Sequence, residues 1–306
     1  MRILGTGSVV AKKIVTNDDL AKTMETSDEW IRERTGIGAR HVAEEGESPA
    51  TLGADASRKA LEMAGVSVED IDLILVATAS SMQRVPTISC QVQNLIGASK
   101  AAAIDIGAAC AGFMTALTVA DAYLKSGNFK KILVIGTETL SDMVDWTDRT
   151  SCILFGDGAG AVVVDAQGND LIYALGADGS KGDALSCPID GYVSMDGQAV
   201  YRFATKTVPE CMRVALDKAG LTPADIDRYI LHQANIRIIE AIAKNMKEPK
   251  EKFPVNITNY GNMSSASIPV LLDEQVRAGQ IHVGDTIMMS GFGAGLTYGA
   301  CILKWS

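Results

Sequence analysis

Long apolar runs and an excess of basic charge are both missing from this chain of 306 residues. No run of about 18 apolar residues occurs, so the sequence predicts no segment that crosses a bilayer. The 28 Lys and Arg are outnumbered by 37 Asp and Glu, which gives a formal net charge of −9. Because phosphate binding needs a basic surface, we expect no nucleic acid as partner, and the missing apolar runs predict no membrane partner. The first residues lack the apolar core of a signal peptide, which predicts a cytoplasmic protein.

Cysteine pairs with metal-ligand spacing are also missing. The six cysteines contain no CxxC pair, which favours reduced thiols over disulfides and predicts no metal site. They are Cys90, Cys110, Cys152, Cys187, Cys211 and Cys301. Histidine is scarce, with three residues. The 47% of apolar and 21% of charged residues are typical of a globular protein, and the length suits one large domain or two fused smaller ones.

Two sequence blocks occur twice, in the same order. The segment AGVSVEDIDLILVATAS (Ala64–Ser80) has a partner in AGLTPADIDRYILHQAN (Ala219–Asn235), and each combines a helix end, a capped turn and an apolar strand. The glycine-rich segment GDGAGAVVVD (Gly156–Asp165) has a partner in GFGAGLTYGACIL (Gly291–Leu303). The sequence therefore predicts a duplicated α/β unit whose halves meet near residue 165.

Apolar runs alternate with helical patterns in both halves, residues 1–165 and 166–306. The predicted strands are Leu73–Ala77, Ala103–Ile106, Ile132–Ile135, Ala161–Val164, Ile230–His232, Ile287–Ser290 and Ala300–Leu303. The predicted helices are Leu52–Ala64, Thr87–Ile96, Ala111–Lys125, Thr205–Lys218, Ile236–Asn245 and Ser267–Ala278. Because the strands are continuous apolar runs, we expect helices on both faces of each sheet. A single undivided sheet is the alternative, but it does not explain the paired blocks.

Cys110, in the segment DIGAACAGFMTAL, is a candidate nucleophile. A strand pattern ends before it and a helix of small residues begins, so the thiol would lie at a helix N-terminus. The positive end of the helix dipole and the free backbone N–H groups there favour a thiolate. The alternative is a buried structural cysteine, which is the commoner role of a single cysteine.

His232 is the histidine best placed for acid–base chemistry or hydrogen-bond donation. It follows the predicted strand Tyr229–Leu231, and the C-terminal ends of such strands form ligand sites in open α/β folds. His41 lies in a polar stretch and His282 in a turn-like segment, so both are weaker candidates. The alternative for His232 is a half-buried histidine that bonds the backbone.

Asn262 lies in the segment NITNYGNMSSASIPVLL, before a predicted helix. Asp227 follows Asp72 by 155 residues, and the same offset carries Cys110 to position 265, close to Asn262. Pseudo-twofold symmetry would then bring Cys110 and Asn262 face to face where the halves meet. The alternative is an ordinary turn asparagine.

The two glycine-rich turns, GDGAG and GFGAG, do not fit the GxGxxG dinucleotide fingerprint, because each leads into a strand rather than a helix. A bare backbone N–H in such a turn can instead form half of an oxyanion hole. A nucleotide-binding module is therefore the weakest of the functions considered.

Six motifs follow one another along the whole chain: TSDEWIRERTGI (Thr26–Ile37), AACAGF around Cys110, DRTSCILFGDGAGA (Asp148–Ala161), HQANIRI (His232–Ile238), NYGNMSSASIP (Asn259–Pro269) and GFGAGLTYG (Gly291–Gly299). Together they resemble β-ketoacyl-acyl-carrier-protein synthase III. The resemblance implies the α/β thiolase fold, with two similar halves in five αβαβα layers, and a homodimer. It also implies a Cys-His-Asn triad, which falls on Cys110, His232 and Asn262.

The resemblance implies an acyltransferase that starts type II fatty acid synthesis. Cys110 would take an acyl group from acyl-CoA, and decarboxylative Claisen condensation would then join that group to malonyl-acyl-carrier-protein. The backbone N–H groups of Cys110 and Ala294 would form the oxyanion hole, while His232 and Asn262 would stabilise the enolate. Coenzyme A enters as a substrate thioester, and no cofactor or metal is implied.

The resemblance also assigns binding positions. Those for CoA are Thr26, Trp30, Arg34, Arg149, Gly197, Tyr201 and Asn235. Trp30 and Arg149 would stack on the adenine ring. Carrier-protein docking would use Arg202, Arg237 and Lys244, a local basic patch on an acidic chain.

The chain departs from the family pattern at a few positions. Met263 replaces a usual threonine, Ala294 a usual glycine, and Val85 a bulkier residue beside the acyl pocket, while Ser180–Tyr201 is expected to be a short loop. These departures leave the primer open. One alternative is a specialised relative that condenses other CoA thioesters, or transfers acyl groups, in secondary metabolism. A non-catalytic thiolase-fold partner is another, but such partners generally lose the nucleophile.

Overall fold

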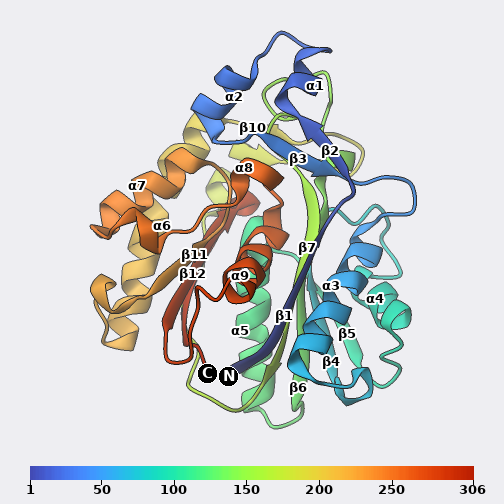
Figure 1. Cartoon of the computed structure of the whole chain (residues 1–306), viewed down its shortest axis with the longest axis vertical. Helices are drawn as coiled ribbons and strands as arrows, with labels where there is room; N and C mark the ends of the chain where they lie inside the picture. Colours follow the sequence, from blue (N-terminus) through green and yellow to red (C-terminus); the bar gives the residue numbers. More distant parts are fainter.

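The computed structural model covers residues 1–306 and contains two main β-sheets (Figure 1). The first sheet has five strands in the order β1-β7-β6-β4-β5, and β7 is antiparallel to both of its neighbours. Its strands are β1 (Arg2–Val10), β4 (Leu73–Ala77), β5 (Ala102–Ile106), β6 (Lys131–Thr139) and β7 (Asp157–Asp165). The second sheet has four strands in the order β11-β12-β13-β8. Its strands are β8 (Ile172–Ala177), β11 (Arg228–Leu231), β12 (Thr286–Gly293) and β13 (Thr297–Lys304).

Helices form three layers around the two sheets, so the molecule has five layers in all (Figure 1). α3 and α4 pack on the outer face of the first sheet, and α6 and α7 pack on the outer face of the second. α5 and α9 lie between the sheets and share one apolar core with both of them. These helices are α3 (Pro49–Ala64), α4 (Ile88–Ile96), α5 (Gly112–Lys125), α6 (Gly197–Ala219), α7 (Ile236–Met246) and α9 (Ser267–Arg277). The arrangement is the αβαβα sandwich that the family resemblance implies.

The central helix α5 is apolar on nearly all sides, as a helix enclosed by two sheets must be. Phe113 and Met114 are fully buried in the core between the sheets. The buried Asp121 on this helix is compensated by Lys125, whose Nζ lies 2.9 Å from its carboxylate. No helix of the chain is both long enough and apolar enough to pass through a membrane.

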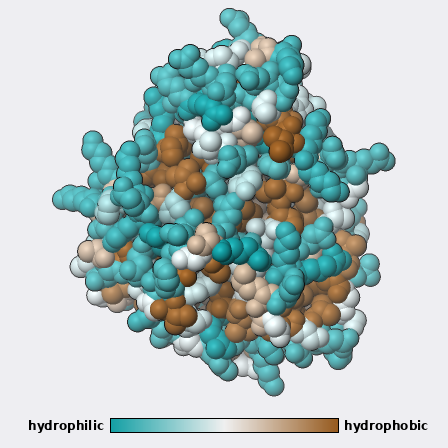
Figure 2. Space-filling model, in the orientation of Figure 1, coloured by the Kyte–Doolittle hydropathy of each residue, from teal (hydrophilic) through white to brown (hydrophobic).

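Smaller elements close one end of the molecule, at the top of Figure 1. They are the hairpin β2 (Lys13–Thr16) and β3 (Ala39–Val42), the hairpin β9 (Leu185–Ser186) and β10 (Ser194–Met195), and the helices α1 (Asn17–Ala21), α2 (Asp28–Thr35) and α8 (Ile257–Tyr260). In the same view, hydrophilic side chains dominate this end and the edges, and apolar side chains are visible mainly lower down (Figure 2).

The duplication predicted from the sequence is confirmed by elements that recur at an offset of 155 residues. α3 ends at Ala64 and α6 ends at Ala219, and each is followed by a left-handed glycine cap. The carboxylate of Asp72 accepts the backbone N–H of Lys131, and that of Asp227 accepts the N–H of Thr286. Each half therefore uses the same device to connect two neighbouring strands.

β8 and the small elements at one end of the molecule were not among the predicted elements, and two further regions also differ from the sequence prediction. β1 was not expected, because Gly5 and Gly7 interrupt its apolar pattern; both face α3 so closely that a Cβ would overlap that helix's backbone. The prediction of a short loop over Ser180–Tyr201 is wrong. This segment contains β9, β10 and the first turn of α6, which starts at Gly197 because Asp196 caps it by accepting the N–H groups of Gln198 and Ala199.

Candidate active site

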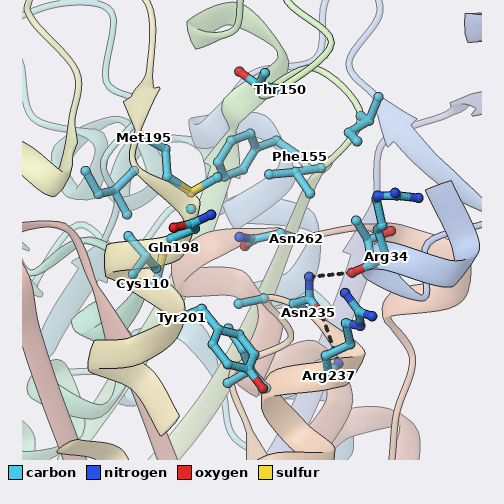
Figure 3. A pocket seen from close by; sticks show the side chains of 18 of the residues that line it. Arg34, Cys110, Thr150, Phe155, Met195, Gln198, Tyr201, Asn235, Arg237 and Asn262 are labelled. Atoms are coloured by element: carbon cyan, nitrogen blue, oxygen red, sulfur yellow. Dashed lines mark hydrogen bonds between the residues drawn. The ribbon is translucent and has the colours of Figure 1, made fainter. Parts of the chain in front are cut away.

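A cavity of about 870 Å³ opens at the end of the molecule that carries the small elements. Both halves contribute to its wall, together with the β9–β10 hairpin, and Figure 3 shows part of the lining. Its inner wall is apolar, from Leu154, Phe155, Leu185, Met195 and Phe292. Its polar lining includes four arginines, Arg34, Arg149, Arg202 and Arg237. A cavity with this lining suits a ligand that joins an acyl chain to a phosphate-rich group.

The structure brings Cys110, His232 and Asn262 to this one cavity. Each of the three is buried, with 8%, 3% and 7% of its surface exposed. Cys110 lies in a 3-10 turn between β5 and α5, and His232 directly follows β11. Asn262 stands between α8 and the turn that leads into α9. Three distant parts of the chain thus present a thiol, an imidazole and an amide to the same space.

Cys110 lies just before the N-terminus of α5, as the sequence predicted. Burial nevertheless raises the pKa of its thiol to about 12, and the neighbouring Ser264 side chain acts in the opposite direction. Burial therefore acts against the helix N-terminus, whose dipole and free N–H groups favour the thiolate. The nearby buried Glu138 would raise this pKa further if it carried a charge.

His232 is held by its backbone N–H, which donates to Ser290 O at 2.9 Å and continues the pairing of β11 with β12. Its ring packs edge-on against Phe292, with 5.6 Å between the centroids. Burial lowers the pKa of the imidazole to about 3, so the ring is neutral at physiological pH. Nδ1 is buried and has no partner. Because an unpaired acceptor costs less than an unpaired N–H, the proton belongs on Nε2, where it can be donated.

We expect the decarboxylation step to be insensitive to histidine protonation between about pH 5 and 8. His232 has its ordinary pKa of 6.5 only when exposed to water, and in the fold it would gain a proton only near pH 3. The test is the rate of CO₂ release from a malonyl thioester by acylated enzyme, measured across this range. A tenfold fall per pH unit below 6.5 would show that His232 titrates normally and that its neutral state is misassigned.

Asn262 is oriented by its neighbours on both sides. Its Oδ1 accepts the backbone N–H of Ser264 at 2.8 Å, so its Nδ2 group is the end left to donate. Its backbone N–H donates to Leu154 O at 2.8 Å, and its carbonyl accepts the N–H of Gly156 at 3.0 Å. Asn262 thus belongs to the second half by sequence but is attached to a loop of the first.

The symmetry partner of Cys110 is Ser265 rather than Asn262. The turns Ala109–Ala111 and Ser264–Ala266 correspond at the offset of 155 residues, and both open with a left-handed residue, Ala109 at φ 45° and Ser264 at φ 44°. The two turns pack against each other, because α5 and α9 follow them between the sheets. Asn262 reaches the cavity from the loop just before the turn Ser264–Ala266.

The glycine-rich turn after β12 lies directly beside the Cys110 turn. A Cβ at Gly293 would come within 2.5 Å of the Cys110 backbone nitrogen, so only glycine permits this approach. Thr297 joins the two turns, since its hydroxyl donates to Ala108 O at 2.9 Å and lies 3.1 Å from Ala294 O. Ala294, the other predicted oxyanion residue, immediately follows Gly293.

Most of the residues predicted to contact CoA line the cavity: Trp30, Arg34, Arg149, Gly197, Tyr201 and Asn235. Thr26 does not line it, although its buried hydroxyl has no partner. The Trp30 ring already contacts two guanidinium groups, with the Cζ atoms of Arg34 and Arg149 at 4.5 and 4.7 Å from its centroid. An adenine ring between Trp30 and Arg149 would therefore require Arg149 to move.

Asn235 lies at the mouth of the cavity, where its side chain caps the N-terminus of α7 (Figure 3). Its Oδ1 accepts the N–H of Arg237 at 2.8 Å, and its Nδ2 donates to Arg34 O at 3.0 Å. Of the residues predicted for carrier-protein docking, Arg202 and Arg237 line the cavity, whereas Lys244 is exposed outside it. Val85, predicted beside the acyl pocket, is 78% exposed and does not line the cavity.

Sequence reasoning missed several lining residues. Phe155 stands one position before the glycine-rich segment GDGAG and could have been found from that motif. Met195 and Gln198 come from the segment predicted as a loop, and no pattern in the sequence indicates them. Glu138, a buried carboxyl group whose Oε1 lies 2.7 Å from Ser265 Oγ, was missed because it carries no recognisable signature.

Comparison with known proteins places this geometry in one family. Residues 104–179 match the family described as 3-oxoacyl-[acyl-carrier-protein (ACP)] synthase III, and residues 216–305 match its C-terminal part. The chain is 49% identical over 307 residues to β-ketoacyl-[acyl-carrier-protein] synthase III 1 of Bacillus cereus, an alignment that covers 99% of this chain and 98% of the relative.

Comparison with solved structures gives the same family. The structure of 3-oxoacyl-[acyl-carrier-protein] synthase III from Aquifex aeolicus has a TM-score of 0.97 and 44% identity, covering 99% of each chain. The priming β-ketosynthase of the R1128 polyketide biosynthetic pathway has a TM-score of 0.96 and 37% identity, covering 99% of this chain and 96% of the other. These similarities confirm the thiolase fold expected from the sequence motifs. The chain belongs to the β-ketoacyl-acyl-carrier-protein synthase III family of condensing enzymes.

Proposed function

We propose that this protein is the condensing enzyme that initiates type II fatty acid synthesis, with Cys110, His232 and Asn262 as its catalytic residues. The observation that carries the proposal is the convergence of these three side chains on one cavity in a chain of this family. The apolar inner wall accepts the acyl chain, and the arginines bind the phosphate groups of CoA. The reaction needs no cofactor or metal.

The first step is acylation of Cys110. Its sulfur attacks the thioester carbonyl of acyl-CoA, the C–S bond to CoA breaks, and the thiol proton leaves with the CoA thiolate. The backbone N–H groups of Cys110 and Ala294 stabilise the tetrahedral oxyanion. Because the thiol is buried and its pKa is raised, deprotonation has to be assisted within the cavity.

The second step forms the enolate. Malonyl-acyl-carrier-protein loses CO₂, and the electron pair of the broken C–C bond moves onto the thioester. The Nε2–H of His232 and the Nδ2–H of Asn262 donate to the thioester oxygen as negative charge develops there. The carbanion then attacks the acyl carbonyl on Cys110, the C–S bond to Cys110 breaks to release its thiolate, and the β-ketoacyl product leaves on the carrier protein.

The proposal extends to the organisation of the chain and its partners. Residues 1–165 form the half that carries the nucleophile, and residues 166–306 form the half that carries His232 and Asn262. The cytoplasmic enzyme acts as a homodimer, and Arg202, Arg237 and Lys244 receive the acidic carrier protein. Charge complementarity supports this docking site, since basic side chains gather at the cavity mouth of an otherwise acidic chain.

The decisive experiment uses a panel of acyl-CoAs with intact-mass measurement, followed by malonyl-acyl-carrier-protein. We expect one acyl adduct per chain and then a β-ketoacyl-carrier-protein product. Absence of an adduct with every acyl-CoA would refute the proposal. The alternative is a specialised enzyme of secondary metabolism, and the observation that supports it is the similarity to a priming polyketide β-ketosynthase. Condensation that proceeds as well with malonyl-CoA as with the carrier protein would support that alternative.

Replacing Arg149 with alanine should raise the KM for acyl-CoA by about tenfold and leave kcat nearly unchanged. The guanidinium lies over Trp30 at the cavity wall, far from the bond that reacts, so its loss weakens binding alone. Arg58→Ala is a matched control, because this exposed arginine lies on α3 outside the cavity. An Arg149→Ala enzyme with unchanged KM would remove this residue from the CoA site.

A further inference from the structure

Gln233, the residue after His232, is a buried polar side chain that the steps described above do not use. It is fully buried and does not line the cavity, although both of its neighbours, His232 and Ala234, do. A buried amide is costly unless its donor and acceptor groups have partners. Gln233 finds these partners in two different segments of the chain.

The side-chain amide of Gln233 links the end of β11 to the start of α8. Its Nε2 donates to Leu231 O at 2.9 Å. Its Oε1 accepts the backbone N–H of Asn256 at 3.1 Å and, over a longer contact, that of Ile257 at 3.4 Å. Because a carbonyl can only accept and a backbone N–H can only donate, these partners fix the orientation of the amide. The link therefore needs a side chain that combines a donor with an acceptor.

The helix α8 connects this link to Asn262. It is a single turn, closed by the N–H of Gly261, which donates to Ile257 O at 2.9 Å. Asn262 follows directly, and its own backbone N–H donates to Leu154 O in the first half. The segment is thus attached at its far end to the first half and at its start to the second half, through Gln233. Because one closed turn moves as a unit, a shift at its start displaces Asn262.

His232 is attached to the same strand end. Its backbone N–H donates to Ser290 O, and the residue before it, Leu231, supplies the carbonyl that accepts from Gln233. Gln233 therefore joins the strand that carries one enolate donor to the segment that carries the other. Two donors to a single oxygen must each lie about 2.7–3.1 Å from it, so their separation has little tolerance.

We propose that Gln233 is a positioning residue of the decarboxylation step and sets the separation between the imidazole of His232 and the amide of Asn262. It acts from behind the cavity wall and does not touch the substrate. This inference rests on the proposed function, which takes these two side chains as donors to the enolate. Acylation of Cys110 depends on the oxyanion turn instead, so the role of Gln233 is confined to the second step.

Gln233→Met tests the role, because it replaces the amide with an apolar side chain of similar length. Acylation by acyl-CoA, followed by intact mass, should stay within about twofold of the wild-type rate. CO₂ release from malonyl-acyl-carrier-protein by acylated enzyme should slow about 10- to 100-fold in kcat with little change in KM, because misplacing a group by about 1 Å costs a factor of this order. A normal rate of CO₂ release, or an equal loss of both steps, would overturn the proposal.

Two further substitutions at the same position complete the test. Gln233→Ala also breaks the link but leaves room for a water molecule to pair the freed groups, so it should fold and show the same selective loss. Gln233→Glu keeps an oxygen for the two N–H groups and should release CO₂ at least about fivefold faster than Gln233→Met. A glutamate variant as slow as the methionine variant would contradict the link to α8. The matched control is Gln167→Met, since Gln167 is exposed after β7 and lies outside the cavity.

A double variant separates positioning from a general weakening of the fold. If Gln233 acts by placing Asn262, adding Gln233→Met to Asn262→Ala should slow CO₂ release by no more than about twofold beyond Asn262→Ala alone. If the two losses multiply instead, Gln233 acts independently of Asn262 and the proposal fails.

The single variants distinguish this inference from the proposed function. If Asn262→Ala slows CO₂ release while Gln233→Met releases it normally, only the present inference fails. If Asn262→Ala releases CO₂ normally, or if the wild-type enzyme forms no acyl adduct, the proposed function fails and this inference fails with it.

Discussion

Cys110→Ala is expected to form no acyl adduct with any acyl-CoA and to lose condensing activity by a factor of about 10⁴ or more. Cys110 is the only cysteine among the residues that line the cavity, and no other side chain there can hold an acyl group as a thioester. The fold should persist, because alanine already stands on both sides, at Ala109 and Ala111. Intact-mass measurement after incubation with acyl-CoA gives the result directly.

The matched control is Cys90→Ser, which removes an exposed thiol that does not line the cavity. This variant should keep both the adduct and the activity. An acyl adduct that survives in Cys110→Ala, or that disappears in Cys90→Ser, would place the nucleophile elsewhere. Loss of the adduct together with a large fall in thermal stability would instead point to a structural role for Cys110.

The architecture was predictable because it repeats. The offset between Asp72 and Asp227 recurs in the ends of α3 and α6 and in the starts of α5 and α9. Sequence periodicity and apolar runs therefore predicted two α/β halves with helices on both faces of each sheet, while the five-layer order was implied by the family resemblance. β1 escaped detection because its glycines, which permit contact with α3, also remove the strand pattern. The start of α6 was missed because its cap, Asp196, follows an irregular segment with no helical periodicity.

The site was predictable only in part. Cys110, His232 and Asn262 could be found because they lie at the ends of regular elements and within recognisable motifs. The protonation state of the Cys110 thiol could not be predicted, because its burial depends on how the two halves pack. Its position at a helix end alone suggested a lowered pKa, whereas burial raises it. Glu138 is visible only in three dimensions, because no sequence motif indicates that its buried carboxyl group lies near Cys110.

His232→Ala and Asn262→Ala are expected to retain acylation of Cys110 and to slow decarboxylation by about 10²–10³-fold each. Each substitution removes one donor to the developing enolate and leaves the sulfur and the oxyanion turn in place. The measurement is CO₂ release from malonyl-acyl-carrier-protein by enzyme that has first been acylated. Normal CO₂ release from either variant would show that its side chain does not stabilise the enolate.

Asn262→Asp distinguishes the two roles of Asn262, which are donation by Nδ2 to the enolate and support of the turn at Ser264 by Oδ1. Alanine leaves the Ser264 N–H without its acceptor, which costs about 1–3 kcal/mol and disturbs the turn. Aspartate keeps an oxygen for that N–H but places a second oxygen where Nδ2 donates, so it should slow decarboxylation at least as much as alanine while preserving stability. If aspartate restored the rate, the role of Asn262 would be to hold the turn, and His232 would be left as the only side-chain donor to the enolate.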